Sequence, residues 1–267
     1  MHDFAFIFAG FAVGLIVGLT GVGGGSLMTP ILIFFFGVKP YLAVGTDLLF
    51  AAFTKMGGTV SLARQRLVPW RVVGQLCLGS IPAALLALWA LKELGPASAQ
   101  AQHIMTTTLG FALLLTATAT FYKVVVFSQK RQSEEQSLRA SSGPEALRPR
   151  HWSLPVLLGA VIGTLVTFTS VGAGAIGVTV LLLVYPLLPL PRIIGADIAY
   201  AVPLTLLAGL GHATLGSVDW PLLAQLLAGS LPGIWLGSRL VTRTPERLIR
   251  SLLSVLLAWA GAKLVLI

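Results

Sequence analysis

Residues 20–25, Thr-Gly-Val-Gly-Gly-Gly, return at residues 169–174 as Thr-Ser-Val-Gly-Ala-Gly, 149 positions later. Asp47 returns as Asp197, 150 positions later. A third set of residues recurs with a spacing of 150 positions: Val68, Trp70, Gln75, Leu76, Gly79, Ser80 and Pro82 match Val218, Trp220, Gln225, Leu226, Gly229, Ser230 and Pro232. The chain is therefore an internal duplication with a Gly-rich interruption in each copy.

The composition is that of an integral membrane protein. Hydrophobic residues make up 56% of the 267 residues, charged residues only 10%, and the mean hydropathy is +0.90. A soluble protein of this length needs a polar surface that this chain does not supply. The single cysteine, Cys77, lies in an apolar stretch, so we expect neither a disulfide nor a cysteine-based metal site. No Lys or Arg precedes the first apolar run, so we expect no secretory signal peptide.

The hydropathy pattern predicts ten apolar segments, five in each half. Their expected bounds are 4–19, 26–37, 41–62, 70–91 and 101–127 in the first half, and 152–169, 175–188, 193–215, 220–240 and 247–267 in the second. A helix needs about 20 residues, with a range of about 17–25, to span the hydrocarbon core. The last three segments of each half reach this length, whereas the first two are short and flank the Gly-rich break.

We therefore expect an all-α integral membrane protein with two inverted structural repeats, each with three full spans plus a short broken-helix pair. Five spans per half would satisfy the same pattern. The first transmembrane repeat is expected at residues 1–127 and the second at 151–267. The hydrophilic residues 128–150 are expected to form a disordered cytoplasmic linker.

The expected inversion rests on the basic loops, which carry much of the net charge of +9. Loop 62–71 has three Arg, whereas its counterpart 212–221 has no Lys or Arg; conversely, the basic loop 239–250 corresponds to the nearly neutral loop 92–100. Cytoplasmic loops are enriched in Lys and Arg, so the exchange predicts halves inserted in opposite orientations. Both termini then face away from the cytoplasm, and the positive charge does not indicate a nucleic-acid partner.

The Gly-rich breaks are the expected substrate site. Each Gly costs about 1 kcal/mol relative to Ala in a helix, and irregular backbone at membrane depth occurs only inside protein or beside a water-filled cavity. The free N–H groups and positive dipole end of each following helix favour an anion. Close helix packing is the alternative role of such glycines. The expected substrate-binding residues are Thr20, Gly21, Gly23, Gly24, Gly25, Ser26, Thr169, Ser170, Gly172, Gly174 and Lys55.

Ionisable residues inside the apolar segments are functional candidates, because their burial in a membrane is costly. Asp47 and Asp197 are expected to serve coupling or gating, with helix capping or pairing near the interface as the alternative. Lys55 follows Asp47 by about two turns. Three roles are open to it: it neutralises that carboxylate, it contacts an anionic substrate, or its side chain reaches the cytoplasmic surface. The matching position in the second half is Thr205, and Arg192 lies close enough in sequence to reach Asp197.

Other classes of function have weaker support. His103 and His212 each lack a second ligand at suitable spacing, so we expect no metal and no cofactor. A divalent-cation permease that uses Asp47 and Asp197 is an alternative, since oxygen ligands suit hard cations. An intramembrane enzyme is disfavoured because there is no Gly-x-Ser-x-Gly motif. A structural or receptor-like membrane protein is a further alternative.

Three stretches of the first half resemble the sulfite exporter TauE/SafE family: Gly-Val-Gly-Gly-Gly-Ser at 21–26 with Pro30, Val-Gly-Thr-Asp-Leu-Leu-Phe-Ala-Ala-Phe-Thr-Lys at 44–55, and Val-Pro-Trp at 68–70. The likeness extends over almost the whole chain except the linker. The second half departs from the motif, because Ser170 and Ala173 replace Gly and no Pro matches Pro30.

The resemblance implies an inner-membrane secondary transporter, commonly an exporter, of small anions such as sulfite, sulfonates, sulfoacetate or thiosulfate-like solutes. No Walker-type Gly-x-x-x-x-Gly-Lys-[Ser/Thr] motif is present, so the expected energy source is an ion gradient, of H⁺ or Na⁺. The expected partners are thus the anion, the coupling ion and the lipid bilayer. We expect alternating access around a site at the midplane. The sequence indicates no oligomeric state.

Overall fold

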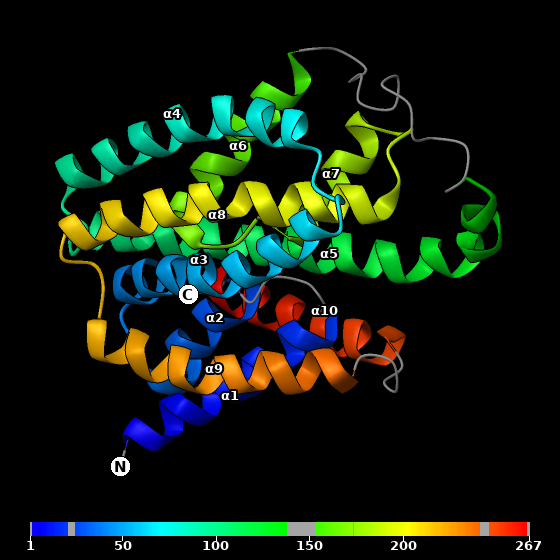
Figure 1. Ribbon diagram of the computed structural model, residues 1–267. Helices are drawn as coiled ribbons and strands as arrows, with labels where there is room; N and C mark the ends of the chain where they lie inside the picture. Colours follow the sequence, from blue (N-terminus) through cyan, green and yellow to red (C-terminus); the bar gives the residue numbers. More distant parts are fainter. Residues whose placement is uncertain (1, 21–24, 138–152, 173, 241–245, 266–267) are drawn as a thin grey trace.

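A computed structural model of the chain describes residues 2–20, 25–137, 153–172, 174–240 and 246–265. Within these ranges all regular structure is α-helical, which confirms the expected all-α class. Figure 1 labels the helices: α1 (His2–Thr20), α2 (Gly25–Phe36), α3 (Pro40–Arg64), α4 (Trp70–Leu94), α5 (Ala99–Ser137), α6 (Leu154–Thr169), α7 (Ala175–Val184), α8 (Leu190–Thr214), α9 (Trp220–Leu240) and α10 (Glu246–Val265).

The helix lengths match the expected division into long and short segments. α2 has 12 residues and α7 has 10, so neither is long enough to cross the hydrocarbon core alone. In the described part of the chain, three helical stretches are both long and apolar enough to span a membrane: Trp70–Leu94, Ala99–Phe121 and Leu190–Thr214. α3 also has 25 residues, but it carries Asp47, Lys55 and Arg64.

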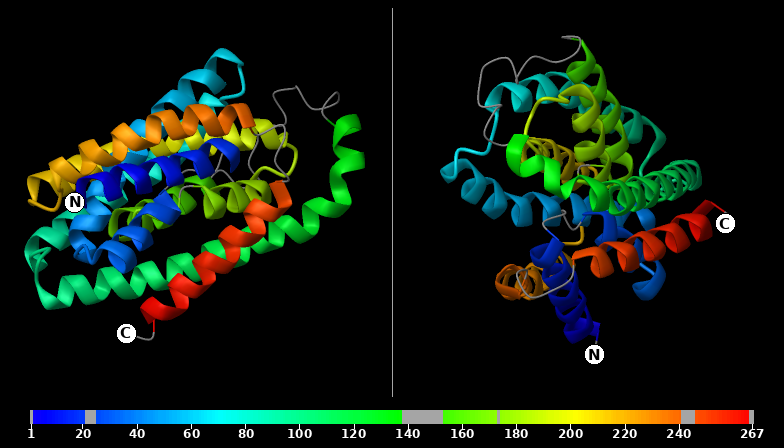
Figure 2. Two further views of the ribbon diagram at one scale, coloured as in Figure 1. Left: turned by 90° about the horizontal axis from the view of Figure 1, so that it is seen from below. Right: turned by 90° about the vertical axis from the view of Figure 1, so that its right-hand side faces the viewer.

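The structure corrects one expectation about the linker. Residues 128–137, expected to be disordered, continue α5 as a helix to Ser137. Gln, Lys, Arg and Glu dominate this stretch, and these residue types have high helix propensity, so a polar composition does not by itself end a helix. Figure 2 shows α5 as the long green helix at the edge of the molecule, with α10 beside it.

The two halves exchange helices. α1 of the first half packs along α9 of the second, and α6 of the second half packs along α4 of the first. Glycines bring both pairs together: a Cβ on Gly14 would lie 2.5 Å from the Ser230 carbonyl oxygen, and a Cβ on Gly163 would lie 2.5 Å from that of Ser80. Gly14 and Gly163 occupy corresponding positions in the two halves, as do Ser80 and Ser230. The packing is therefore reciprocal.

α3 and α8, the corresponding helices of the two halves, lie against each other at the centre and run antiparallel. Near the start of α3, Gly45 lies against His212 and Ser217; near its end, Thr59 Oγ1 donates to the Ile198 carbonyl at 3.5 Å. The contact is again reciprocal. A Cβ on Gly45 would strike the carbonyl oxygen of Ser217, and one on Gly195 would strike that of Leu67.

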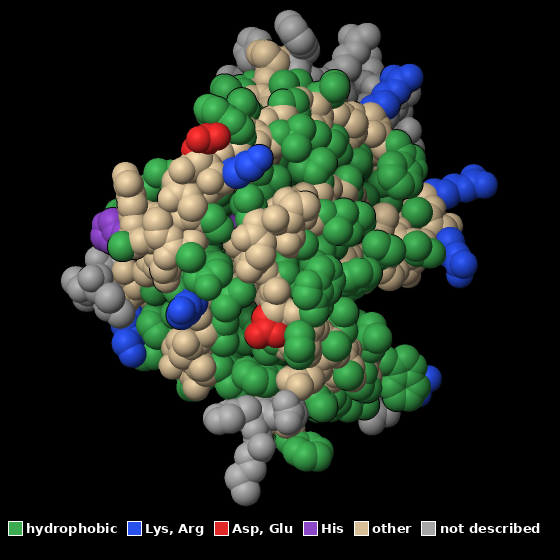
Figure 3. All heavy atoms as spheres, turned by 90° about the vertical axis from the view of Figure 1, so that its left-hand side faces the viewer, with side chains coloured by type: hydrophobic (Ala, Val, Ile, Leu, Met, Phe, Trp, Pro, Cys, Tyr) green, Lys and Arg blue, Asp and Glu red, His purple; other side chains and the backbone are tan. Residues whose placement is uncertain are grey.

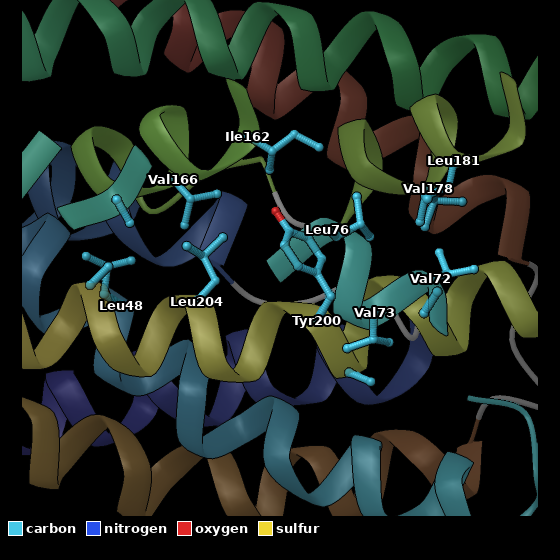
Figure 4. Packing of buried hydrophobic residues seen from close by; sticks show 14 of the residues in the cluster. Leu48, Val72, Val73, Leu76, Ile162, Val166, Val178, Leu181, Tyr200 and Leu204 are labelled. Carbon is cyan, nitrogen blue, oxygen red and sulfur yellow. The ribbon is translucent and has the colours of Figure 1, made fainter. Parts of the chain in front are cut away.

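The buried core consists of two apolar clusters, each of which draws residues from both halves. Figure 4 shows part of the first cluster, where Leu48 of α3, Leu76 of α4, Ile162 of α6 and Leu204 of α8 meet. Large apolar side chains also lie on the outside, as the lipid-facing surface of a membrane protein requires; Leu78, for example, is 69% exposed. On the face in Figure 3, apolar side chains cover much of the surface and charged ones are few.

We predict that Gly79→Ala destabilises the protein by about 1–3 kcal/mol, because the new Cβ would strike the Val156 backbone and force α4 away from α6. Gly74→Ala is the matched control on the same helix, since a Cβ there meets nothing within 4 Å. Thermal unfolding in detergent compares the two. Equal melting temperatures for the two variants would contradict the packing role of Gly79.

Candidate functional site

Asp47 is the first charged residue of the site and is fully buried on α3. Thr29, five positions into the fragment α2 that follows the first break, donates its hydroxyl to Asp47 Oδ2 at 2.5 Å. The other carboxylate oxygen, Oδ1, has no hydrogen-bond partner among the described residues. One oxygen is therefore fixed by α2, and the other faces the interior of the molecule.

The second break approaches the same carboxylate. Ser170 ends α6 with φ 58°, in the left-handed region, and Gly172 and Gly174 both have φ 136°. Only Gly adopts such φ values readily, so the chain turns sharply here between α6 and α7. The Ser170 side chain interacts electrostatically with Asp47. No hydrogen bond of normal geometry joins them, and the buried hydroxyl has no partner in the described part of the chain.

Several donors at the second break are used within the break itself. The Thr169 hydroxyl lies 2.6 Å from the Leu165 carbonyl oxygen and 3.0 Å from that of Val171, and its oxygen accepts the Val171 N–H. In the first turn of α7, the N–H of Gly177 donates to Gly172 and that of Val178 donates to Gly174. Thr169 is therefore engaged in shaping the turn, and only part of the expected donor set remains for a solute.

Lys55 connects the two halves electrostatically. Its side chain is 6% exposed, and its ammonium interacts with both Asp197 of α8 and Asp47 of α3. The structure thus brings together the three ionisable residues singled out in the sequence. The expected contact between Arg192 and Asp197 is not among these interactions; the buried Arg192 Nε has no hydrogen-bond partner among the described residues.

Asp197 lies against the start of α7, as Asp47 lies against α2. A Cβ on Gly177 would collide with Asp197 Oδ1, so only Gly permits this close approach. Asp197 itself is 2% exposed. Each carboxylate therefore touches the short fragment that follows the break of its own half, and the helices that carry the carboxylates are the antiparallel pair α3 and α8.

The first break lies largely outside the described residues. Gly21, Gly23 and Gly24 fall between the end of α1 at Thr20 and the start of α2 at Gly25. The side chains of Thr20 and Ser26 are likewise outside the description. Their expected roles in binding the substrate stay predictions.

Sequence reasoning missed Thr29 and gave no role to His212. Thr29 lies in an apolar run one position before Pro30, and no local pattern sets its hydroxyl apart. His212 is fully buried, and its Nε2 lies 3.0 Å from the Thr167 carbonyl oxygen. A carbonyl only accepts, so Nε2 carries the proton and His212 holds the end of α6 next to the break.

His103 is exposed on α5. No group of three or more His, Cys, Asp or Glu side chains suited to a metal is found among the described residues.

These features define a class: a helical membrane transporter made of two halves, with a helix break beside a buried charged cluster to which both halves contribute. The chain belongs to the sulfite exporter TauE/SafE family, because the model of that family matches residues 6–264. The family consists of membrane transporters and not enzymes.

Relatives with similar sequences are all described as probable membrane transporter proteins. The chain is 36% identical over 260 residues to "Probable membrane transporter protein YjnA" of Bacillus subtilis (strain 168), with 97% of this chain and 98% of the relative covered. It is 24% identical over 251 residues to "Probable membrane transporter protein YdhB" of the same organism, with 94% and 95% covered. A "Probable membrane transporter protein" of Xylella fastidiosa (strain 9a5c) is 26% identical over 237 residues, with 88% and 83% covered. No solved structure matches the chain.

We predict that Thr29→Val destabilises the protein by about 1–3 kcal/mol, because it leaves a buried carboxylate without its hydroxyl donor. Thr116→Val is the matched control: Thr116 is also buried, but its hydroxyl donates only to the Ala112 carbonyl of its own helix. The free energy of unfolding in detergent checks the difference. A loss no larger than that of the control would show that the Thr29–Asp47 hydrogen bond contributes little.

Proposed function

We propose that the protein is a secondary transporter, acting as an exporter, of small anions such as sulfite, sulfonates or sulfoacetate across the inner membrane. The family description, sulfite exporter, supports the class of substrate. The proposed binding site lies between the two Gly-rich breaks. Backbone N–H groups, Thr and Ser hydroxyls and the Lys55 ammonium are its donors, and Asp47 and Asp197 couple transport to an ion.

The observation that carries this proposal is the single ammonium shared by two carboxylates. With all three groups ionised, Lys55, Asp47 and Asp197 together have a charge of −1, which repels an anion. Loss of one carboxylate charge makes the cluster neutral, and loss of both leaves Lys55 as a free cation. Since charges in a low-dielectric interior interact strongly, the protonation state of the carboxylates determines whether an anion can bind.

This charge balance suggests proton coupling. Protonation of Asp47 or Asp197 releases Lys55 to attract the solute, and departure of the proton restores the attraction between Lys55 and the carboxylates and expels the solute. A bound proton then raises the affinity for the anion, and a bound anion raises the affinity for the proton by the same factor. The same arrangement suits coupling to Na⁺ less well, because the Lys55 ammonium already interacts with both carboxylates and competes with a second cation.

Two features of the fold support alternating access by inverted repeats. The corresponding helices α3 and α8 run antiparallel, so they would cross a membrane in opposite directions. The glycine-packed pairs α1 with α9 and α4 with α6 are equivalent in the two halves. In this proposal the two pairs move against the central helices and expose the charged cluster to each side of the membrane in turn.

The alternative of a divalent-cation permease is less well supported. Its proposed ligands, Asp47 and Asp197, both interact with the ammonium of Lys55, which competes with a metal ion. One test separates the two functions. Replacement of both Asp by Asn should abolish uptake of a metal ion if the protein is a cation permease, but should leave anion binding largely intact if it is an anion transporter.

We predict that Lys55→Gln abolishes anion transport, because it removes the only charge of the cluster that attracts an anion. Lys92→Gln, an exposed change in the last turn of α4, is the control and should transport normally. The measurement is the flux of sulfite, sulfoacetate, taurine and thiosulfate into proteoliposomes. If the wild-type protein moves none of them, and none protects it thermally, the proposed substrate class is wrong.

We also predict that affinity for thiosulfate rises as the pH falls, because carboxylate protonation releases Lys55 and the charge of thiosulfate stays constant near neutral pH. In Asp47→Asn, affinity at neutral pH should be closer to its value in acid, since one carboxylate is permanently neutral. Isothermal titration at several pH values tests this. A pH dependence identical in the two proteins would rule out Asp47 as the coupling group.

A further inference from the structure

Tyr200 carries a buried hydroxyl group to which the proposed binding site has so far assigned no role. Its side chain is fully buried on α8, and its hydroxyl has no hydrogen-bond partner in the described part of the chain. Tyr200 nevertheless interacts electrostatically with Asp197, three positions earlier on the same helix, and with Cys77 of α4. A buried polar group without a partner is costly, so this hydroxyl calls for a partner that the described part of the chain does not provide.

The surroundings of the ring explain why no side chain among the described residues satisfies this hydroxyl. Figure 4 shows Tyr200 extending from α8 toward α6, with its hydroxyl oxygen at the far end and Leu76, Ile162 and Val166 around it. These neighbours are apolar. Ile162 and Val166 also lie next to Gly172 of the second break, where a Cβ would come within 3.8 Å and 3.2 Å of them. The hydroxyl therefore lies in the same neighbourhood as the break.

The corresponding residues of the two halves show that this hydroxyl is specific to the second half. Phe50 stands at the position of Tyr200 in the first half and is also fully buried. Conversely, Thr29, which donates to Asp47, corresponds to Val178. Each half thus places one hydroxyl near its aspartate. The Thr29 hydroxyl is bound to its carboxylate, whereas the Tyr200 hydroxyl is left without a partner.

We propose that Tyr200 binds the transported anion by donating its hydroxyl to one of the oxygens of the solute. The proposal rests on the proposed function and adds a binding residue from the second half of the chain. The class of ligand is a small oxyanion, since a phenol donates one hydrogen bond and the nearby Asp197 is offset by Lys55. Tyr200, Ser170 and Lys55 then supply donors to the solute from three different helices or their ends.

The test compares two Tyr→Phe substitutions that remove the same atom. Tyr200→Phe deletes a hydroxyl without a partner, so the protein without substrate should be as stable as the wild type or more stable. Tyr185→Phe is the matched control, because the Tyr185 hydroxyl donates to Gln75 Oε1 at 2.5 Å. That variant should be less stable and should bind anions normally. Thermal unfolding in detergent, without and with thiosulfate or sulfite, measures both properties.

For Tyr200→Phe we expect the dissociation constant for the anion to rise about 10- to 100-fold, the loss expected when a hydrogen bond to a charged group is removed. Unchanged affinity in this variant, with wild-type protein that binds the anion, would overturn the role of Tyr200 and leave the proposed function standing. Lower stability of Tyr200→Phe without substrate would also overturn it, because the hydroxyl would then serve the fold. If the wild-type protein binds neither anion, the proposed function fails and this inference fails with it.

Discussion

The buried ammonium of Lys55 is the interaction on which the arrangement of the centre depends. A lone charge inside a membrane protein is costly, and it becomes tolerable only when opposite charges lie close to it. The two carboxylates with which Lys55 interacts come from different halves, Asp47 from α3 and Asp197 from α8. Asp47 shares α3 with Lys55, whereas Asp197 comes near Lys55 only after the two halves have assembled, which ties the electrostatics of the site to the contact between α3 and α8.

The two halves are alike in fold but unlike in chemistry at this centre. Lys55 has Thr205 as its counterpart, Tyr200 has Phe50, and Thr29 has Val178. A symmetric frame thus holds an asymmetric set of side chains, with one cation for two carboxylates.

Local signals in the sequence predicted much of this structure. The repeated Gly-rich motif located the end of α6 and the starts of α2 and α7, and hydropathy placed the helices close to their observed bounds, apart from the end of α5. Asp47, Lys55 and Asp197 were singled out because charge is rare in apolar segments. The sequence did not reveal that Lys55 also reaches Asp197, since that contact joins residues far apart along the chain.

The errors and omissions have physical reasons. The end of α5 was misplaced because polarity was taken as a sign of disorder, although the residues concerned favour helix. Thr29 and Tyr200 were missed because a hydroxyl in an apolar segment has no distinctive pattern until its neighbours are known. The pairing of α1 with α9 was also missed, although glycines recur at every fourth position from Gly10 to Gly18 and from Gly229 to Gly237.

The exchange of α1 and α6 between the halves has a consequence for biosynthesis. α1 emerges first from the ribosome, yet its main partner, α9, is among the last helices to be made. Until then its glycine-lined side has no protein surface to cover it. A chain whose main contacts join residues far apart in the sequence completes its packing slowly. Each half is thus a repeat in the evolutionary sense without being an independent folding unit.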